Sequence, residues 1–399
     1  MRTVEQHAKI IAGLLSPTPV TPVPLRQTAG LVLAGDLFAP IDLPPFANSA
    51  MDGYAVRAAD VQRLPVTLPV SQDIPAGRSD TAPLQPGTAA RIMTGAPLPA
   101  GADVIVQVER TDAGFATVRI DSAPAPGVHV RSPGEDDRAG SVVLAAGSVV
   151  GPPQIGVAAA LGFATLPVRR PLRVLVLSTG SELVEPGRNL QPGQIYESNS
   201  PMLAAGIDAV GAAASIEHFV ADDVSSLRTA LSRAATDSDL VVTSGGVSAG
   251  AYEVVKDALT GRGIEFAKVA MQPGMPQGAG LFALTPERSV PIVTLPGNPV
   301  SAYVSFEVFL RPAIRAAMGH PDITRPVLRA PLAMAITSPA GKRQFRRGQL
   351  DTVAGTVAPW GGPGSHLLSW LAGADCMIVV GEDITHLDAG DEVEVWLLG

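Results

Sequence analysis

Apolar runs rich in β-branched residues alternate with stretches of helical spacing in the second half of the chain, and this is its clearest pattern. The apolar runs lie at 172–178, 213–220, 240–243 and 290–295. The stretches with helical spacing lie at 199–211, 222–235, 252–260 and 300–318. Buried strands that alternate with helices predict an α/β unit whose parallel sheet is covered on both faces. Such a sheet binds its ligand just beyond the carboxyl ends of the strands.

The remainder of the chain shows short apolar runs between proline and glycine turns. Residues 46–137 predict a β-rich unit of short strands. The last segment, 326–399, alternates in the same way and predicts a small β-barrel or sandwich. At the start of the chain, Thr3 and Gln6 have the spacing of a capping box that opens a helix. The Pro-rich segment that follows contains one short helical stretch, near 29–34.

Two glycine-rich turns follow strands of the predicted α/β unit. They read Ser244-Gly-Gly-Val-Ser248 and Pro296-Gly-Asn-Pro-Val-Ser301. A strand that ends in small residues and leads into a helix leaves backbone N–H groups free beside the positive end of the helix dipole, which suits a phosphate. A tight strand-to-helix connection needs glycine in any case, so one such turn alone is equally consistent with a structural role. The pair of turns, with carboxylates nearby, favours a phosphorylated ligand.

Acidic residues follow three of the predicted strands. Glu182 lies in a third small-residue turn that begins at Ser178, Asp222 opens the next helical stretch, and Glu253 follows the first glycine-rich turn. In phosphate sites Mg²⁺ prefers one or two carboxylates together with phosphate oxygens and water. The three carboxylates therefore predict a Mg²⁺ site at the strand ends, although an aspartate at position 222 is also an ordinary helix N-cap.

The predicted β-rich unit contains two further polar turns. The first crowds Asn48, Ser49 and Asp52 between two aromatic residues and forms a polar surface suited to a ligand. The second, 131–136, is first basic and then acidic, and it ends in Asp136. An Asp-Gly pair is also common in plain turns, and the second turn is also consistent with a solvated loop. Both interpretations of each turn stay open on composition alone.

Composition excludes several classes of protein. The 399 residues carry a formal net charge of −8, whereas a general nucleic-acid binder is basic, so we expect no nucleic-acid partner. Cys376 is the single cysteine, which excludes an internal disulfide or a cysteine-based metal site, and the histidines lack metal-ligand spacing. The N-terminus is too polar for a signal peptide, and the most apolar window, 157–168, is too short to span a membrane. We expect a cytoplasmic protein without membrane contact.

Taken together, the motifs resemble those of the molybdenum insertases, or molybdopterin molybdenumtransferases, of the bacterial MoeA type, which are related to the E domain of gephyrin. The matching segments follow the family order along essentially the whole chain: Asn48-Ser-Ala-Met-Asp-Gly-Tyr-Ala-Val56, Arg91-Ile-Met-Thr-Gly-Ala-Pro97, Gly134-Glu-Asp136, Ser178-Thr-Gly180 with Glu182, Ser244-Gly-Gly-Val-Ser248, Leu295-Pro-Gly-Asn-Pro-Val-Ser301, Arg347-Gly348 and Gly364-Ser-His366. So many ordered matches are highly specific.

The resemblance implies a subunit of four domains in a homodimer. The domains are an elongated linker domain at 1–45 and 138–170, an inserted β-rich domain at 46–137, an α/β molybdopterin-binding domain at 171–320 and a C-terminal β domain at 326–399. The implied active site lies between the α/β domain of one subunit and the N-terminal part of the other. The implied reaction inserts molybdenum from molybdate into adenylylated molybdopterin, with Mg²⁺, and releases molybdenum cofactor and AMP. A molybdopterin adenylyltransferase and acceptor molybdoenzymes are the implied protein partners.

The resemblance also assigns roles to individual positions. The implied catalytic residues are Asp52, Asp136, Glu182, Asp222, Glu253 and Lys268, and the implied metal ligands among them are Glu182, Asp222 and Glu253. Contacts to the pterin substrate are implied for Thr179, Gly180, Ser244, Gly245, Gly246, Ser248, Pro296, Gly297, Asn298 and Ser301. Contacts to molybdate are implied for Pro276, Arg347 and Ser365.

The chain departs from the family pattern at the expected oxyanion site. The family has Lys-Pro-Gly-Lys-Pro where this chain has Gln272-Pro-Gly-Met-Pro276, so two cations are missing. We therefore expect weak molybdate binding, with Arg347 or the basic residues just before it as compensation. A non-catalytic paralogue that stores or carries the pterin is the alternative function. A nucleotide pyrophosphatase that shares only the α/β domain is a second alternative, opposed by the motif at 48–56 and by the C-terminal β domain.

Overall fold

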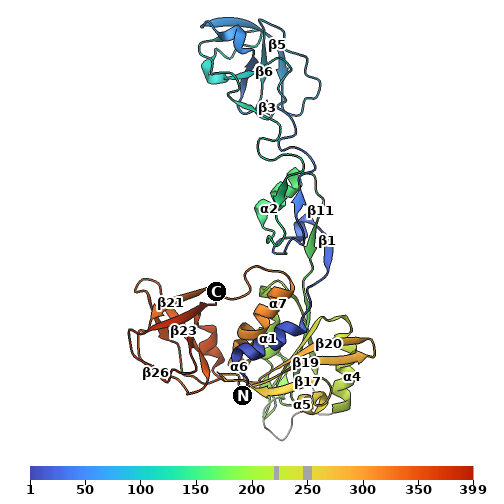
Figure 1. The fold of residues 1–399 in the computed structure, drawn as a ribbon, viewed down its shortest axis with the longest axis vertical. Coiled ribbons are helices and arrows are strands. Elements are labelled where there is room, and N and C mark those ends of the chain that lie inside the picture. Colours follow the sequence, from blue (N-terminus) through green and yellow to red (C-terminus); the bar gives the residue numbers. More distant parts are fainter. Residues whose placement is uncertain (220–223, 246–253, 399) are drawn as a thin grey trace.

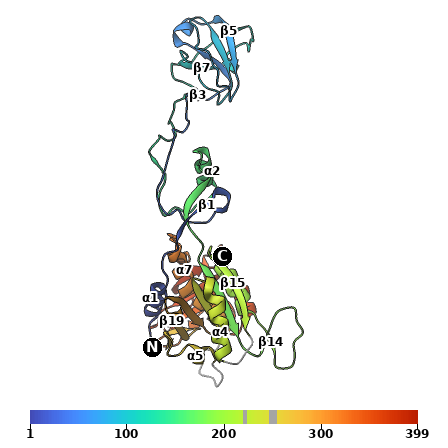
Figure 2. The ribbon, with the colours of Figure 1, turned by 90° about the vertical axis from the view of Figure 1, so that its right-hand side faces the viewer.

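The computed structural model describes residues 1–219, 224–245 and 254–398. The chain forms an elongated molecule, with a β-rich body at one end, two packed bodies at the other, and a thin connection between the ends (Figures 1 and 2). Both termini lie at the end with the two packed bodies. Among the described helices, none is long and apolar enough to cross a membrane.

The α/β body is built on a six-stranded sheet. Its strand order is β15 (Ala213–Phe219), β12 (Arg173–Thr179), β16 (Leu240–Ser244), β20 (Arg288–Leu295), β19 (Pro276–Thr285) and β17 (Ile264–Lys268). The first four are parallel, as predicted. The prediction of a parallel sheet is wrong for β19 and β17, which are antiparallel. Thr285 pairs with Arg288 across a two-residue turn, and so short a connection cannot make the crossover that parallel strands need.

Helices cover both faces of this sheet. Successive side chains of a strand point to opposite faces, so each buried strand contributes to two hydrophobic cores. Val174 and Val176 of β12 lie in the core on one face, while Leu175 and Leu177 lie in the core on the other. The helices of the first face are α1 (Val4–Leu14), α3 (Asn199–Ala209), α6 (Pro299–Ser305) and α7 (Arg311–Ala317), and those of the second are α4 (Val224–Ala234) and α5 (Val254–Leu259).

The first helix has the predicted capping box. The Thr3 hydroxyl accepts a hydrogen bond from the backbone N–H of Gln6, and the Gln6 side chain accepts one from the backbone N–H of Thr3. The helix packs against α7 and against the turn that precedes α7. Its buried side chains, Val4 and Ile11, join the core of the α/β body. This helix, which the sequence assigns to the linker segment, is therefore packed on the α/β body.

The single helix predicted at 300–318 forms as two helices joined by a wider turn. Between α6 and α7, residues Phe306–Leu310 form a π-helical turn, in which the N–H of Arg311 donates to the carbonyl of Phe306. Pro312 has no N–H to donate to the carbonyl four residues before it, so the regular pattern of α-helical bonds cannot continue through this point. The wider turn passes the proline without ending the helical path.

The C-terminal body is a β unit, and its sheet recruits one strand from the α/β segment. The sheet order is β18 (Met271–Gln272), β23 (Arg343–Asp351), β25 (Cys376–Val380), β27 (Glu392–Leu397) and β21 (Val327–Pro331), with β24 (Thr356–Pro359) beside β23 and a short pair β22 (Ile336–Thr337) and β26 (His386–Leu387). Because β18 directly precedes β19, the pairing of Gln272 with Gln344 joins the two bodies. Cys376 is buried in this sheet, and burial raises the pKa of its thiol.

The N-terminal β-rich body and its connection contain only short elements. The body has a sheet of order β7 (Val104–Gln107), β4 (Gly53–Val56), β6 (Ala89–Ile92), β5 (Val66–Ile74) and β8 (Thr117–Ile120), with the pair β3 (Asn48–Ser49) and β9 (Val130–Arg131). The connection contains β1 (Val20–Pro24), β2 (Leu37–Phe38), β10 (Val142–Leu144), α2 (Pro152–Ala160) and β11 (Thr165–Arg169). The helical stretch expected near 29–34 is wrong, because Val32 and Leu33 form β-bridges to Val149 and Val168 instead.

Candidate active site

The two glycine-rich turns meet at one edge of the α/β sheet. Ser244 and Leu295 are paired at the carboxyl ends of neighbouring parallel strands, and the N–H of Gly245 donates to the carbonyl of Leu295 at 3.2 Å. A Cβ atom on Gly297 would lie 3.3 Å from the Cα atom of Gly245. Gly245 has a φ of +96°, which favours glycine, and a Cβ atom there would lie 3.2 Å from the carbonyl oxygen of Thr179. The three small-residue turns of the sequence thus converge on one place.

An open cleft of about 820 Å³ lies over this edge. Its walls come from the strand-end turns, from the segment that leads into α3, and from the loop 363–368 of the C-terminal body. The predicted site residues that line it are Thr179, Glu182, Ser244, Gly245, Pro276, Pro296, Gly297, Asn298, Ser301 and Ser365. The structure therefore brings together most of the residues assigned to the pterin and two of the three assigned to molybdate.

Asn199, the first residue of α3, holds the two glycine turns together. Its Nδ2 atom donates to Ser244 Oγ at 2.8 Å and to the carbonyl oxygen of Gly297 at 2.6 Å. Its Oδ1 atom is buried in the wall of the cleft, and no described residue donates a hydrogen bond to it. The sequence prediction did not include Asn199, because a polar residue at the start of a helix is a common cap. The polar string Glu197-Ser-Asn-Ser200 was the available signal.

Glu182 and Glu197 are the described carboxylates of the cleft. The Glu182 side chain is exposed and folds back over Gly180, where a Cβ atom would lie 2.7 Å from Glu182 Oε2. Any side chain at position 180 would therefore displace this carboxylate. Glu197 is buried and its Oε1 atom accepts the N–H of Ser200 at 2.9 Å, so it also fixes the start of α3.

The C-terminal loop is attached to the second glycine turn by two hydrogen bonds. Asn298 Nδ2 donates to Ser365 Oγ at 2.8 Å, and the N–H of Val300 donates to the carbonyl oxygen of Ser365 at 3.1 Å. Ser301, one turn into α6, is buried and its carbonyl accepts the hydroxyl of Ser305 at 2.7 Å. The cleft is thus closed on one side by a segment from a different body of the chain.

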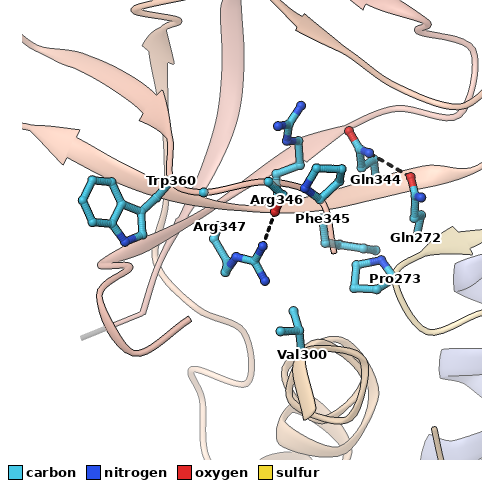
Figure 3. A pocket seen from close by; sticks show the side chains of 11 residues that line it. Gln272, Pro273, Val300, Gln344, Phe345, Arg346, Arg347 and Trp360 are labelled. Carbon is cyan, nitrogen blue, oxygen red and sulfur yellow. Dashed lines mark hydrogen bonds between the residues drawn. The ribbon is translucent and has the colours of Figure 1, made fainter. Parts of the chain in front are cut away.

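Arg347 lies behind this loop, in a second and much smaller pocket (Figure 3). Its guanidinium donates to the carbonyl oxygens of Gly364 at 3.1 Å and Leu367 at 3.4 Å, and also to that of Gly362. Burial lowers the pKa of Arg347, and the neighbouring charge of Arg346 lowers it further. The structure therefore places this predicted molybdate residue against the loop that carries Ser365, with most of its donors engaged.

Several predicted residues lie elsewhere. Asp52 lies between β3 and β4 of the N-terminal β-rich body, and Asp136 follows β9 of the same body. That body lies at the opposite end of the molecule from the α/β body, so one chain does not bring these carboxylates to its own cleft (Figure 1). Lys268 is exposed at the end of β17, paired in register with Pro276, and does not line the cleft. The remaining predicted residues lie outside the described part of the chain: Asp222, Glu253, Gly246 and Ser248.

Asp52 is held in a defined geometry within the N-terminal body. Its Oδ1 atom accepts hydrogen bonds from the N–H and from the hydroxyl of Thr94, both at 2.7 Å. These bonds, led by the one from the backbone N–H, lower the pKa of the Asp52 carboxyl, and the Arg91 charge adds to the effect. Asp52 therefore presents a fixed, ionised carboxylate at the surface.

Comparison with known proteins agrees with the fold and the cleft. Three family descriptions match successive parts of the chain: the MoeA N-terminal region (domain I and II) at residues 2–162, a "Probable molybdopterin binding domain" at 175–316, and the MoeA C-terminal region (domain IV) at 329–398. The cleft lies between the second and the third of these segments.

Similar proteins match over nearly their whole length. The chain is 55% identical to molybdopterin molybdenumtransferase 2 of Mycobacterium tuberculosis, over 99% of each chain. It is 34% identical to molybdopterin molybdenumtransferase of Haemophilus influenzae, over 99% of this chain and 98% of that protein. A crystal structure of a molybdopterin biosynthesis MoeA protein from Pyrococcus horikosii superimposes with a TM-score of 0.83 at 30% identity, covering 99% and 98% of the two chains. The chain therefore belongs to the MoeA family of molybdopterin molybdenumtransferases.

Proposed function

We propose that this chain inserts molybdenum from molybdate into adenylylated molybdopterin in a Mg²⁺-dependent reaction, and that molybdenum cofactor and AMP are released. The observation that carries the proposal is the convergence of Gly245 and Gly297 with Glu182 and Ser365 on one cleft. Small-residue turns at the carboxyl ends of parallel strands suit phosphate groups. The names of the relatives state the transfer of molybdenum to molybdopterin.

In this proposal the residues of the cleft bind and orient the diphosphate of the substrate. The two small-residue turns leave room for the phosphate oxygens close to the strand ends, while Asn199 keeps the turns together through its bonds to Ser244 and Gly297. A water molecule attacks one phosphorus of the diphosphate and the bridging P–O bond breaks. The attacked phosphate keeps the water oxygen, the other phosphate keeps the bridging oxygen, and the two protons of the water pass to the phosphates or to solvent. One of the two phosphates leaves as AMP and the other stays on the pterin. Negative charge builds up on the phosphate oxygens during this step, so fixed donors around them lower the barrier.

The oxygen atoms at this edge are of the kind that Mg²⁺ selects. The exposed carboxylate of Glu182 and the unpartnered Oδ1 atom of Asn199 are hard oxygen donors beside the phosphate turns. No cluster of three acidic, histidine or cysteine side chains occurs among the described residues. We propose that Glu182, Asp222 and Glu253 hold the ion, which would neutralise charge on the diphosphate.

We further propose that the active protein is a cytoplasmic homodimer in which Asp52 and Asp136 of one subunit complete the cleft of the other. The support is their separation from the cleft within one chain and the fixed geometry of the Asp52 carboxylate. Lys268 and Arg347, which lie outside the lining of the cleft, would contribute positive charge only from a greater distance. The partners would be a molybdopterin adenylyltransferase that supplies the substrate and the molybdoenzymes that receive the product.

The test is to incubate the purified protein with adenylylated molybdopterin, Mg²⁺ and molybdate, and to measure AMP and molybdenum cofactor. Release of AMP together with cofactor would support the insertase. Tight pterin binding without turnover would support the storage or carrier function instead, which one observation favours: no Lys or Arg occurs among the described residues that line the cleft. AMP release without cofactor would indicate a pyrophosphatase, an outcome that the family matches outside the α/β body oppose.

A further inference from the structure

The cleft has few positive charges for a site that binds anions. Among the described lining residues, Glu182 and Glu197 are acidic, His366 is basic, and none is Lys or Arg. The undescribed segments 220–223 and 246–253 contain no Lys, Arg or His in their sequence, and they do contain acidic residues. Among the described residues of this wall, His366 is therefore the one basic side chain that the subunit offers to an anionic substrate.

The position of His366 is fixed although its side chain is exposed. The residue before it is attached to α6 through the Asn298 side chain and the Val300 N–H, as described above. The guanidinium of Arg347 holds the carbonyls of Gly364 and Leu367 on either side of it. A loop fixed on both sides of one residue holds that residue's backbone in place, so a ligand has to order only its side chain.

The imidazole ring of His366 is available for a ligand. No described residue forms a hydrogen bond or an ion pair with it, and His366 is one of the residues that line the cleft. The preceding Gly364 gives the ring its space, because a Cβ atom there would lie 3.1 Å from His366 Cε1. The loop thus carries, at the cleft, an imidazole without a partner among the described residues.

We propose that the imidazole of His366 donates a hydrogen bond to a tetrahedral oxyanion in the cleft. This inference rests on the proposed function and deepens it, because it names the subunit's own basic side chain for the anionic substrate. Two groups of the reaction share this chemistry, the phosphate of the product AMP and molybdate. A charge-assisted hydrogen bond to either would orient it against the glycine turns.

The test measures binding of two probes, AMP with Mg²⁺ and molybdate alone, to the full chain by titration calorimetry. His366→Gln removes the imidazole and should weaken the binding of one probe about tenfold or more. His366→Arg keeps a basic donor and should retain most of that affinity. The probe that is weakened identifies the group: AMP for the phosphate, molybdate for the metal oxyanion.

The matched control is His386→Gln, which changes an exposed histidine of the C-terminal body that is paired with Asp388 at 3.1 Å, outside the cleft. It should leave both affinities unchanged. The inference is overturned if His366→Gln binds both probes as the parent does while the parent turns over, and the proposed function then stands. If the parent neither binds a probe nor releases AMP, the proposed function and this inference fail together.

Discussion

Asn199 carries two hydrogen bonds that keep the glycine turns in register, and its replacement tests how much the cleft depends on them. Asn199→Ala removes both donors, and each such bond contributes about 0.5–1.5 kcal/mol to stability. We expect a loss of about 1–2 kcal/mol in the free energy of unfolding, measured with urea, and a weaker affinity for AMP. Asn189→Ala, in the exposed loop that precedes α3, should change neither. An unaltered AMP affinity in Asn199→Ala would show that the turns hold their geometry alone.

Glu182 is exposed, so its replacement should change the catalytic activity without changing the stability of the fold. We expect Glu182→Ala to abolish Mg²⁺-dependent AMP release while the urea midpoint stays unchanged, because the variant removes a proposed metal ligand. The control is Glu185→Ala in the same loop, whose carboxylate pairs with exposed Arg188. An exposed ion pair of this kind contributes little to the stability of the protein. Normal turnover of Glu182→Ala would remove this residue from the mechanism.

His7 makes the stability of the α/β body depend on pH. Its ring is fully buried against Phe309, with centroids 4.9 Å apart, and burial lowers its pKa to about 4, with a further contribution from Arg2. Because the unfolded chain binds this proton more readily, the contribution of His7 is complete above about pH 6.5 and falls as the pH drops towards 4. The free energy of unfolding should therefore be about 1 kcal/mol lower at pH 5.5 than at neutral pH because of His7.

The measurement is the urea midpoint at pH 7.5 and pH 5.5. His7→Phe keeps an aromatic edge on Phe309 and removes the titration, so its midpoint should fall less on acidification than that of the parent. His320, whose pKa burial also lowers to about 4, is present in both proteins and supplies the remaining slope. Equal slopes in parent and variant would contradict the assignment to His7.

At the level of elements, the loop 362–367 is a surface segment that Arg347 attaches to the C-terminal sheet. The guanidinium reaches several carbonyls at once, which a lysine ammonium cannot do in the same plane. Arg347→Lys should therefore loosen the loop and speed amide exchange of Val300, whose N–H donates to Ser365. Arg343→Lys, in the same strand but paired with Glu382, should leave that exchange unchanged.

If Val300 exchange is unaffected in Arg347→Lys, the bonds of Asn298 and Val300 to Ser365 hold the loop without Arg347, and Arg347 can act on the substrate as the family pattern implies. This distinction separates a positioning role from direct contact with molybdate. It also bears on the two lysines that this chain lacks at the oxyanion site. An arginine that is hydrogen-bonded to carbonyls replaces their interaction with molybdate less well than a free arginine.

The sequence predicted the parallel strands and the meeting of the two glycine turns, since both follow from apolar periodicity and from the shared edge of such a sheet. It did not predict β19, in which Gly278 and Gly280 lower the strand propensity. Those glycines are needed because Cβ atoms there would collide with Thr294 and Gly263 of neighbouring segments. Asn199 was missed for a similar reason, because its partners are distant in sequence and only the fold joins them.

At the scale of the whole molecule, the separation of Asp52 from the cleft is a property that no local pattern contains. Short β-rich segments indicate a separate body, but they do not determine the distance between that body and the cleft at the strand ends of the α/β sheet. The four domain boundaries drawn from the sequence stay predictions, and the packing of α1 against α7 shows that the first segment contributes to two parts of the molecule.

An elongated subunit whose proposed functional carboxylates, Asp52 and Glu182, lie at opposite ends predicts activity from mixed, individually inactive subunits. Asp52→Ala and Glu182→Ala should each be inactive. In a hybrid of the two within a two-fold dimer, one of the two sites pairs an intact Asp52 with an intact Glu182, so random mixing should restore roughly a quarter of the parent activity. The control is a mixture of Asp52→Ala with Asp136→Ala, in which every shared site lacks one carboxylate of the N-terminal part. If subunit exchange is verified and the first mixture stays inactive while the parent turns over, each site is built from one chain, and Asp52 acts through some other contact.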